Sequence, residues 1–398
     1  MREMRDSGIK WLGQFPSRWE LLRAKNFFQL TNERGNDELV LLAATQRFGM
    51  FPQHLLEGVV RVKEDTDLST FRTVHKNDFV ISLRSFQGGF EMSELEGVCS
   101  PAYQTFCAKQ AVVHRYYKYL FKCGGFVDYL NSLTQGIREG KTIKYEDFAV
   151  CLIPKPPLDE QQRIVDYLDI KCAEIDRAIE TAEKSIEELL KYRSSYLEDT
   201  FSRLDSIYPK VKLKYVLEES KEKSVDGIGE PLSITIASGV LRSSELEIPN
   251  PASSMIGAKV VHAGDLVFNK LKAYLGVMYV SSYDGLISSE YAIYRALNPS
   301  DVSLKYIEYL VHTNRIIDEF IIRISGVADG FRRLYTSELF NIAITLPPLL
   351  VQEKAVRGLN TIYDSIDTSI AAKRAIIADL KAYKQSLIYE VVTGKREV

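Results

Sequence analysis

Two short motifs in this chain of 398 residues combine a basic residue, an aromatic residue and a glycine. They are Arg84-Ser85-Phe86-Gln87-Gly88 and Lys272-Ala273-Tyr274-Leu275-Gly276. Arginine and lysine bind phosphates, and arginine also forms paired hydrogen bonds with guanine. We therefore expect nucleic-acid contacts at both motifs. The same residues are equally compatible with a β-turn whose aromatic side chain, Phe86 or Tyr274, lies in the core.

A second pair of motifs consists of loops bracketed by glycines. Gly136-x-x-x-Gly140 parallels Gly326-x-x-x-Gly330. Basic residues lie on or just after these loops, namely Arg138, Lys141, Lys144, Arg332 and Arg333. Such charges would bind phosphates and so increase affinity for DNA without adding sequence specificity. Ordinary solvated loops remain the alternative.

Several isolated polar residues are weaker candidates for contacts with base edges. They are Arg47, Gln87, Tyr103, Gln104, Arg242, Lys270, Ser289 and Glu290. The only two tryptophans, Trp11 and Trp19, are expected to fix the N-terminal segment to its domain rather than to stack on bases.

Known catalytic signatures are missing from the sequence. Asn250-Pro251 and Asn298-Pro299 continue with Ala and Ser, so neither forms the motif of an adenine methyltransferase. Neither a phosphate-binding loop nor an H-E-x-x-H motif occurs. The acidic run from Glu180 to Glu188 is interpreted as an exposed helix face, and the five cysteines, which form no C-x-x-C pair, as buried reduced thiols. We expect no catalytic residue, no metal site and no cofactor of its own.

The formal net charge of −2 is distributed unevenly along the chain. Residues 158–201 carry 6 basic and 12 acidic side chains, a charge of −6, whereas residues 1–157 carry +3. Residues 202–346 and 347–398 carry −1 and +2, so local basic surfaces remain possible. No apolar run approaches the roughly 18 residues of a membrane span, and the N-terminus lacks an apolar signal core. We therefore expect a cytoplasmic protein that does not contact a membrane.

The elements that must position these motifs repeat along the chain. Pro157-Leu158 and Gln161 match Pro348-Leu349 and Gln352, each 191 residues apart. The same register continues through Ile175-Asp176 and Ile366-Asp367 to Tyr192 and Tyr383. His75-x-x-Asp78 similarly parallels His262-x-x-Asp265. This repeat predicts the order globular domain, long helix, globular domain, long helix.

Apolar residues at steps of three, four or seven predict a coiled-coil seam along both helices. In the first helix they include Leu168, Ile175, Ile179, Ile186 and Leu189, and in the second Leu359, Ile366, Ile370, Ile377 and Leu380. The Pro-Pro pairs at 156–157 and 347–348 would end the preceding strands. Asp159 is expected to cap the first helix, which would continue to about Phe201. A long helix with one narrow apolar stripe is not stable alone. The simplest partner for each of these helices is the other one, packed against it within the same chain.

Three segments resemble the specificity subunits of type I restriction–modification enzymes. They are Asp6-Ser7-Gly8-Ile9-Lys10-Trp11-Leu12-Gly13 with Pro16 and Trp19, the segment from Ile153 to Ile164, and Ser386-Leu387-Ile388-Tyr389-Glu390-Val391-Val392-Thr393-Gly394-Lys395. With the repeat, the resemblance covers essentially the whole chain. One departure is Leu350-Val351-Gln352-Glu353, which lacks the Glu-Gln order of Glu160-Gln161.

The resemblance implies an α+β fold with two similar mixed α/β target-recognition domains, at 1–155 and 203–346. Two long antiparallel coiled-coil spacer helices, at 156–202 and 347–398, would separate them in a pseudo-twofold internal repeat. It also implies a non-catalytic subunit that reads a bipartite site in double-stranded DNA, with the helix pair acting as a ruler. Two modification subunits and the restriction subunits would be its partners, and S-adenosylmethionine, ATP and Mg would belong to them.

Two other classes of function remain open from the residues alone. The acidic first helix is compatible with a scaffold that recruits proteins and binds no DNA. An enzyme of an unrecognised type, such as a methyltransferase remnant, is the third possibility. Binding to duplex DNA with partners present, and methyl transfer by the chain alone, discriminate between them.

Overall fold

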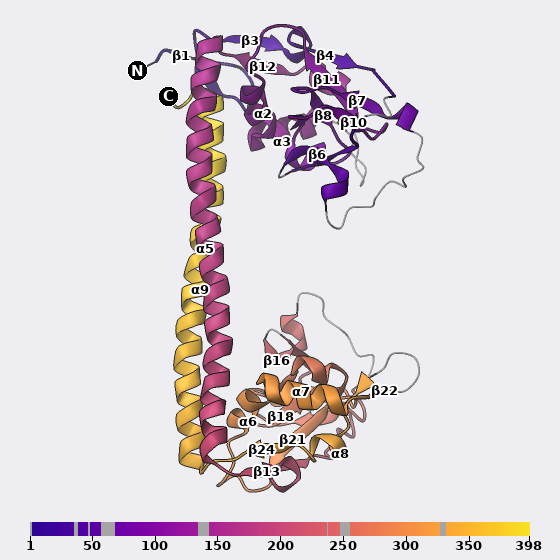
Figure 1. The fold of residues 1–398 in the computed structure, drawn as a ribbon, viewed down its shortest axis with the longest axis vertical. Helices are drawn as coiled ribbons and strands as arrows, with labels where there is room; N and C mark the ends of the chain where they lie inside the picture. Colours follow the sequence, from indigo (N-terminus) through magenta and orange to yellow (C-terminus); the bar gives the residue numbers. More distant parts are fainter. Residues whose placement is uncertain are drawn as a thin grey trace. The chain divides into compact units, whose positions relative to one another are not determined.

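The computed structural model of the chain forms two compact units (Figure 1). Unit 1 comprises Met1–Glu183 and Arg374–Val398, and unit 2 comprises Lys184–Lys373. The structure describes residues 2–35, 39–46, 48–56, 68–133, 143–236, 238–246, 255–326 and 332–398.

Unit 1 is built on a four-stranded antiparallel sheet with the strand order β4-β11-β8-β9. These strands are β4 (Phe28–Thr31), β11 (Gln104–Ala108), β8 (Phe79–Ile81) and β9 (Glu91–Met92). Two-stranded pairs surround it: β1 (Met4–Asp6) with β2 (Gln14–Pro16), β3 (Glu20–Arg23) with β12 (Leu152–Lys155), β5 (Leu42–Thr45) with β6 (Gly49–Pro52), and β7 (Arg72–Val74) with β10 (Gly97–Cys99). Its short helices are α1 (Ser85–Gly88), α2 (His114–Lys122), α3 (Gly124–Leu133) and α4 (Tyr145–Ala149).

The core of unit 1 is strongly aromatic. Phe28, Phe79 and Phe106 come from three neighbouring strands, and their ring centroids lie 5.3 to 5.6 Å apart. Phe121 of α2 and Phe148 of α4 complete the cluster, and all five side chains are buried. Such aromatic pairs stabilise a core beyond the area they bury, so this cluster fixes α2 and α4 against the sheet.

Unit 2 repeats this plan, with a sheet of order β14-β21-β18-β19. The strands are β14 (Leu217–Glu219), β21 (Ala292–Ala296), β18 (Leu266–Phe268) and β19 (Met278–Val280). The surrounding pairs are β13 (Lys210–Lys212) with β24 (Ala343–Thr345), β15 (Leu232–Thr235) with β16 (Gly239–Arg242), β17 (Lys259–Val261) with β20 (Gly285–Ile287), and β22 (Ser325–Gly326) with β23 (Arg332–Arg333). Its helices include η6 (Lys270–Leu275), α6 (Leu304–Val311), α7 (Asn314–Arg323) and α8 (Thr336–Leu339).

A buried glutamine makes the same contacts at the start of each long helix. Gln161 Nε2 donates to the carbonyl oxygen of Pro156 at 2.8 Å, and its Oε1 accepts from the backbone N–H of Val113 at 2.9 Å. Gln352 does the same with Pro347 at 2.7 Å and Ser303 at 2.9 Å. Both side chains are fully buried. The 191-residue register found in the sequence therefore corresponds to a repeated set of hydrogen bonds.

The two long helices are α5 (Leu158–Ile207) and α9 (Leu349–Val392). Each begins directly after a Pro-Pro pair, as predicted. Asp159 lies in the first turn of α5 and pairs with Arg163 at 2.8 Å, so its predicted role as the helix cap is wrong. The helix also continues past Phe201 because the next residue that disfavours helix is Pro209. Among the described residues, no helix is long and apolar enough to cross a membrane.

The two helices pack against each other in antiparallel directions within each unit (Figure 1). In unit 1 Lys384 Nζ lies 2.7 Å from Asp176 Oδ1, and in unit 2 Arg193 Nη1 lies 2.8 Å from Asp367 Oδ1. The predicted α+β class with a pair of long antiparallel helices is confirmed. The domain boundaries at 155, 202 and 346 stay predictions.

Most of the predicted seam residues are buried. The buried residues are Leu168, Ile175, Ile179, Leu359, Ile366, Ile370 and Ile377. Ile186, Leu189 and Leu380 are only half-buried. Two helices alone form a narrow seam that leaves the flanks of such residues in water, which explains the partial exposure.

Candidate nucleic-acid interface

The first predicted motif lies beside a depression on unit 1. The depression has a volume of about 360 Å³ and is lined by Ala44, Thr45, Gln46, Ser82, Arg84, Gln87, Gly88, Gly89 and Glu91. We call it the Arg84 depression. Its wall comes from the end of β5 with the turn after it, from α1 with the residues that flank it, and from β9. Arg84, Gln87 and Gln46 are exposed, whereas Phe86 is half-buried.

Contacts from α2 and α3 hold the backbone of the Arg84 depression. Lys122 Nζ donates to the carbonyl oxygen of Gln46 at 3.2 Å and to Glu91 Oε1 at 2.8 Å. Asn131 Nδ2 donates to the carbonyl oxygen of Phe86 at 2.7 Å. Burial raises the pKa of Glu91, although the positive charge of Lys122 opposes this rise. Hydrogen bonds from α2 and α3 therefore hold the backbone on both sides of the Arg84 depression.

Gly89 explains why a glycine follows this motif so closely. Its φ is +77°, and a Cβ at this position would overlap the carbonyl oxygen of Phe121 at the end of α2. The backbone of Gly89 thus packs closely against the end of α2 and does not face open solvent. The freedom of Gly89 is therefore used for packing against the end of α2.

Other candidates of unit 1 are already engaged in the fold. Gln104 Oε1 accepts a hydrogen bond of 2.7 Å from the backbone N–H of Tyr145, where α4 begins. Tyr103 is half-buried, and burial raises its pKa. Lys144 is exposed just before α4. Arg47, Arg138 and Lys141 lie outside the described residues.

The second motif forms the 3₁₀ helix η6 in unit 2. Asn269 Oδ1 accepts hydrogen bonds from the backbone N–H groups of Leu271 and Lys272 at 3.1 and 3.2 Å, which starts the helix. Gly276 ends it with a φ of +66°. Lys272 is exposed and Tyr274 is 47% exposed, so Tyr274 does not lie in the core.

Three candidates of unit 2 are brought together beside η6. Arg333 Nη2 lies 2.8 Å from Glu290 Oε2. Burial lowers the pKa of Lys270, and the positive charge of Lys259 is the next largest cause. The charges of Glu290 and Arg333 have smaller, opposite effects on the same pKa. Ser289 is exposed beside Glu290. Arg242 is exposed elsewhere on the unit and lies 4.9 Å from the Tyr283 ring. For Arg332 the structure describes only the backbone, which pairs with Gly326.

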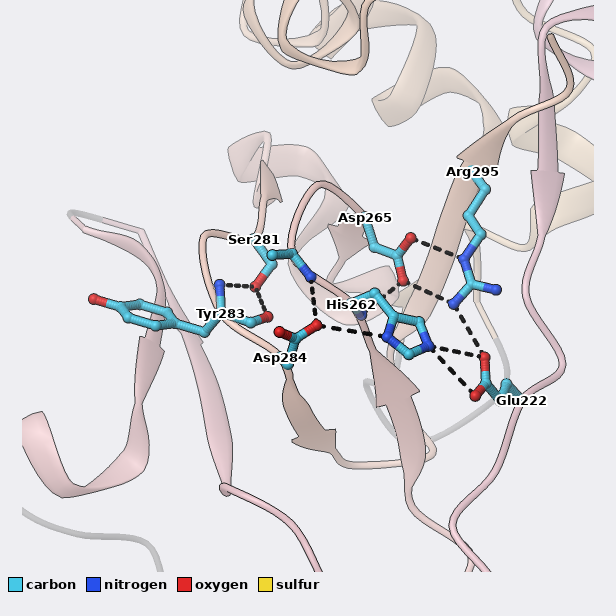
Figure 2. Close-up of polar contacts among 8 residues, drawn as sticks. Glu222, His262, Asp265, Ser281, Tyr283, Asp284 and Arg295 are labelled. Carbon is cyan, nitrogen blue, oxygen red and sulfur yellow. Dashed lines mark hydrogen bonds and ion pairs between the residues drawn. The ribbon is translucent and has the colours of Figure 1, made fainter. Parts of the chain in front are cut away.

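An ion-pair network that sequence reasoning missed joins the end of β21, the residue before β18 and the segment after β14 in unit 2 (Figure 2). Arg295 donates to both oxygens of Asp265 at 2.8 and 3.0 Å and to Glu222 Oε2 at 3.1 Å. The His262 ring lies between Glu222, at 3.2 Å, and Asp284, at 3.5 Å. The pKa of Glu222 is lowered by Arg295 and then by His262. Only the repeat of His262 and Asp265 signalled this network in the sequence.

Unit 1 has the same histidine and aspartate but lacks the arginine. His75 lies 2.8 Å from Glu33 and 3.0 Å from Glu96, and the hydrogen bond with Glu33, more than that with Glu96, raises its pKa. Cys107 occupies the sheet position that Arg295 holds in unit 2. Burial therefore raises the pKa of Asp78, which has no arginine to stabilise its charge.

In the described part of the chain, no group of three His, Cys, Asp or Glu side chains is arranged to hold a metal ion. All five cysteines are free thiols, and four are buried as expected, whereas Cys107 is half-buried in β11.

The tryptophans fix the N-terminal segment, as predicted. Trp11 and Trp19 are 8% and 1% exposed. Trp19 Nε1 donates to Glu160 of α5, and the carbonyl oxygen of Trp11 accepts a hydrogen bond of 2.8 Å from Tyr389 of α9. The three segments that carry the family resemblance therefore meet in one place within unit 1.

Known proteins share both this sequence pattern and this fold. The specificity subunit of the type I restriction enzyme EcoKI, from Escherichia coli (strain K12), is 21% identical over 290 residues. The match covers 67% of this chain and 62% of that protein, less than two thirds of the relative's length. The resemblance to type I specificity subunits is confirmed. No family model matches the sequence.

Solved structures support the same fold. The HsdS subunit from Thermoanaerobacter tengcongensis has a TM-score of 0.56 and 17% identity, over 98% of this chain and 100% of that chain. A chain from a structure that describes complex assembly and conformational transition of the type I R-M system has a TM-score of 0.64 and 16% identity. This match covers 96% of our chain and 99% of the other.

Proposed function

We propose that this chain is the DNA-reading specificity subunit of a type I restriction–modification complex. It reads a bipartite, asymmetric sequence in double-stranded DNA, with one half-site for each recognition domain. The recognition domains are residues 1–155 and 203–346, and the spacer helices are residues 156–202 and 347–398. The chain itself performs no catalysis and works in the cytoplasm.

The repeated construction of the two units carries this proposal. Each unit has the same order of strands, the same buried glutamine and its own share of the antiparallel helices. A protein with two similar readers can bind two half-sites of one duplex, and the second contact then profits from a high effective concentration. Stiff helices fix the spacing of such sites, which a flexible linker would not do.

The helices also offer two equivalent positions for partner subunits. Tyr192 on α5 and Tyr383 on α9 are repeat partners, and each is 51% exposed. Tyrosine is enriched in protein interfaces because one side chain supplies both apolar area and a polar group. Two modification subunits would dock there with S-adenosylmethionine as their cofactor. Restriction subunits that use ATP and Mg would join them.

Sequencing of methylated adenines tests the proposal directly. Cells that express the modification subunits are compared with and without this chain. We expect methylation of a split sequence that depends on the chain. A single continuous methylated motif, or methylation that is unchanged without the chain, would count against the proposal.

A protein scaffold that binds no DNA is the second candidate, because α5 carries an excess of acidic residues. Binding measurements on the chain with its modification subunits separate the two candidates. A scaffold would bind no duplex at any salt concentration. A specificity subunit binds DNA with an affinity that falls steeply as salt rises.

A further inference from the structure

Three polar side chains line the Arg84 depression without a polar partner among the described residues. Gln46, Arg84 and Gln87 are all exposed. Their side chains form no hydrogen bond or ion pair with any residue that the structure describes. Other candidates differ, because Gln104 and Arg333 already have protein partners.

We propose that the Arg84 depression is the base-reading site of unit 1 and that Gln46, Arg84 and Gln87 determine the half-site it selects. This inference rests on the proposed function and deepens it. Gln46 is new as a candidate, because it lies 38 residues before Arg84 and no motif marks it. The structure brings them together through the β5–β6 hairpin and α1.

The depression is preorganised, which favours specific binding. Lys122 holds the carbonyl oxygen of Gln46, and Asn131 holds that of Phe86. The backbone around the three side chains is thus fixed before DNA arrives. Only the side chains must lose freedom, so less binding energy is spent on ordering the site.

The chemistry of the three side chains suits purine edges in the major groove. The guanidinium of Arg84 can donate two hydrogen bonds to O6 and N7 of guanine. Each glutamine can both donate and accept, as N7 and N6 of adenine require. The one acidic residue of the depression, Glu91, is 3% exposed and paired with Lys122. Its negative charge therefore does not oppose the approach of DNA.

The corresponding positions of unit 2 carry different chemistry. In the repeat, Arg84 corresponds to Lys272 and Gln87 corresponds to Leu275. Gln46 follows β5 as Ile236 follows β15. A lysine and two apolar residues cannot form the same bonds to bases. The two half-sites should therefore differ, and the recognised sequence should be asymmetric.

Binding measurements on the complex with its modification subunits test this inference. Each base pair of both half-sites is varied in turn, at several salt concentrations. Gln46→Ala, Arg84→Ala and Gln87→Ala should each reduce discrimination by about 5- to 150-fold at one or two positions of the same half-site. The other half-site should be read as before. Lys25→Ala, which removes an exposed charge of unit 1 elsewhere, serves as the control.

Two further variants separate base reading from simpler roles. In Gly88→Ala the new Cβ would lie 3.1 Å from Gln46 Nε2, so it should alter the same position as Gln46→Ala. Arg84→Lys keeps the charge but loses the paired geometry, so it should lose discrimination while affinity for random DNA persists. Tryptophan fluorescence verifies the folding of unit 1, since both tryptophans belong to it.

Two results would overturn the inference. In the first, Arg84→Ala lowers affinity equally for every sequence and reduces the salt slope by about one, which identifies a phosphate contact. In the second, all three alanine variants leave discrimination unchanged. Either result leaves the proposed function intact. The proposed function itself fails if the wild-type complex prefers no split sequence.

Discussion

The indole Nε1 of Trp19 donates a hydrogen bond of 2.9 Å to Oε2 of Glu160, which lies 141 residues later in the chain. Arg18 binds the same carboxylate oxygen at 2.8 Å, and Arg2 binds the other one. Arg2 also donates to the carbonyl oxygen of Gly394 at 3.2 Å. The N-terminal segment, the start of α5 and the end of α9 are thus joined around one buried carboxylate.

This cluster explains the one departure from the family pattern. Val351 stands where the repeat would place a second copy of Glu160. Glu160 is needed because the tryptophan and two arginines of the N-terminal segment meet it. The next residue in the repeat is a glutamine in both units, Gln161 and Gln352, because each holds the proline pair before its long helix.

The first prediction is that Glu160→Gln destabilises unit 1 by about 3 kcal/mol. The substitution leaves the guanidinium of Arg2, which is largely buried, without its anion, and breaking a buried ion pair from one side costs that much. Urea unfolding followed by tryptophan fluorescence reports unit 1 alone. Glu187→Gln, at an exposed position of α5, should change stability by less than about 0.5 kcal/mol. Equal effects of the two substitutions would show that the carboxylate cluster does not stabilise unit 1.

Local patterns in the sequence were enough to predict the helices and the repeat. The apolar spacing from Leu168 to Ile179 and the Pro-Pro pairs act within a few turns of chain, so they can be read directly. The role of Trp19 in fixing the N-terminal segment to its domain was also predictable, because a tryptophan side chain is highly buried on average in folded proteins.

The candidate site was harder to predict because its parts come from distant segments. Gln46 and Arg84 line one depression only through the packing of a hairpin against α1, and Lys122 of α2 holds the backbone of Gln46. The network of Glu222, Asp265 and Arg295 likewise joins three strands or loops. Such contacts depend on the tertiary fold, and no spacing rule in one sequence reveals them.

The second prediction concerns pH and His312 in unit 2. Burial lowers the pKa of this imidazole to about 4, although its hydrogen bond to the carbonyl oxygen of Gly276 opposes the shift. The unfolded chain takes up a proton near pH 6.5, whereas the folded one does so only near pH 4. Unit 2 should therefore lose about 2 kcal/mol of stability as the pH falls from 7 to 5.

Hydrogen exchange followed by mass spectrometry can measure this loss in peptides of unit 2. His312→Gln should flatten the pH dependence between pH 7 and 5, whatever its effect at pH 7. His54→Gln, at an exposed position of unit 1, should leave that dependence unchanged. A steep loss that persists without His312 would assign it to other groups.

The third prediction concerns the pair of Glu290 and Arg333. In the free protein Glu290 forms an ion pair with the guanidinium of Arg333 and lies near Lys270. Glu290→Gln should release Arg333 for a phosphate contact, so affinity for any duplex should rise and the salt slope should steepen by about one. Glu338→Gln removes an exposed acidic charge of α8 and is the matched control. An increase confined to one DNA sequence would instead identify Glu290 as a base reader.

The last prediction tests the helix pair as a ruler. Seven residues are inserted into both helices, after Glu183 in α5 and after Lys373 in α9. One heptad preserves the apolar seam and adds about 10 Å to each helix. At about 3.4 Å per base pair, the gap in the methylated sequence should grow by up to about three base pairs, with both half-sites unchanged.

Insertion into α5 alone should behave differently, since it shifts one helix against the other. Pairs such as Arg193–Asp367 and Asp176–Lys384 cannot then all form in one register, so stability should fall. Exchange of an existing heptad in each helix for the inserted sequence, at constant length, controls for composition. Altered half-sites with a constant gap after the double insertion would mean that the helices do not set the spacing. Unchanged half-sites with a longer gap would support the ruler, because the residues outside the two long helices keep their sequence.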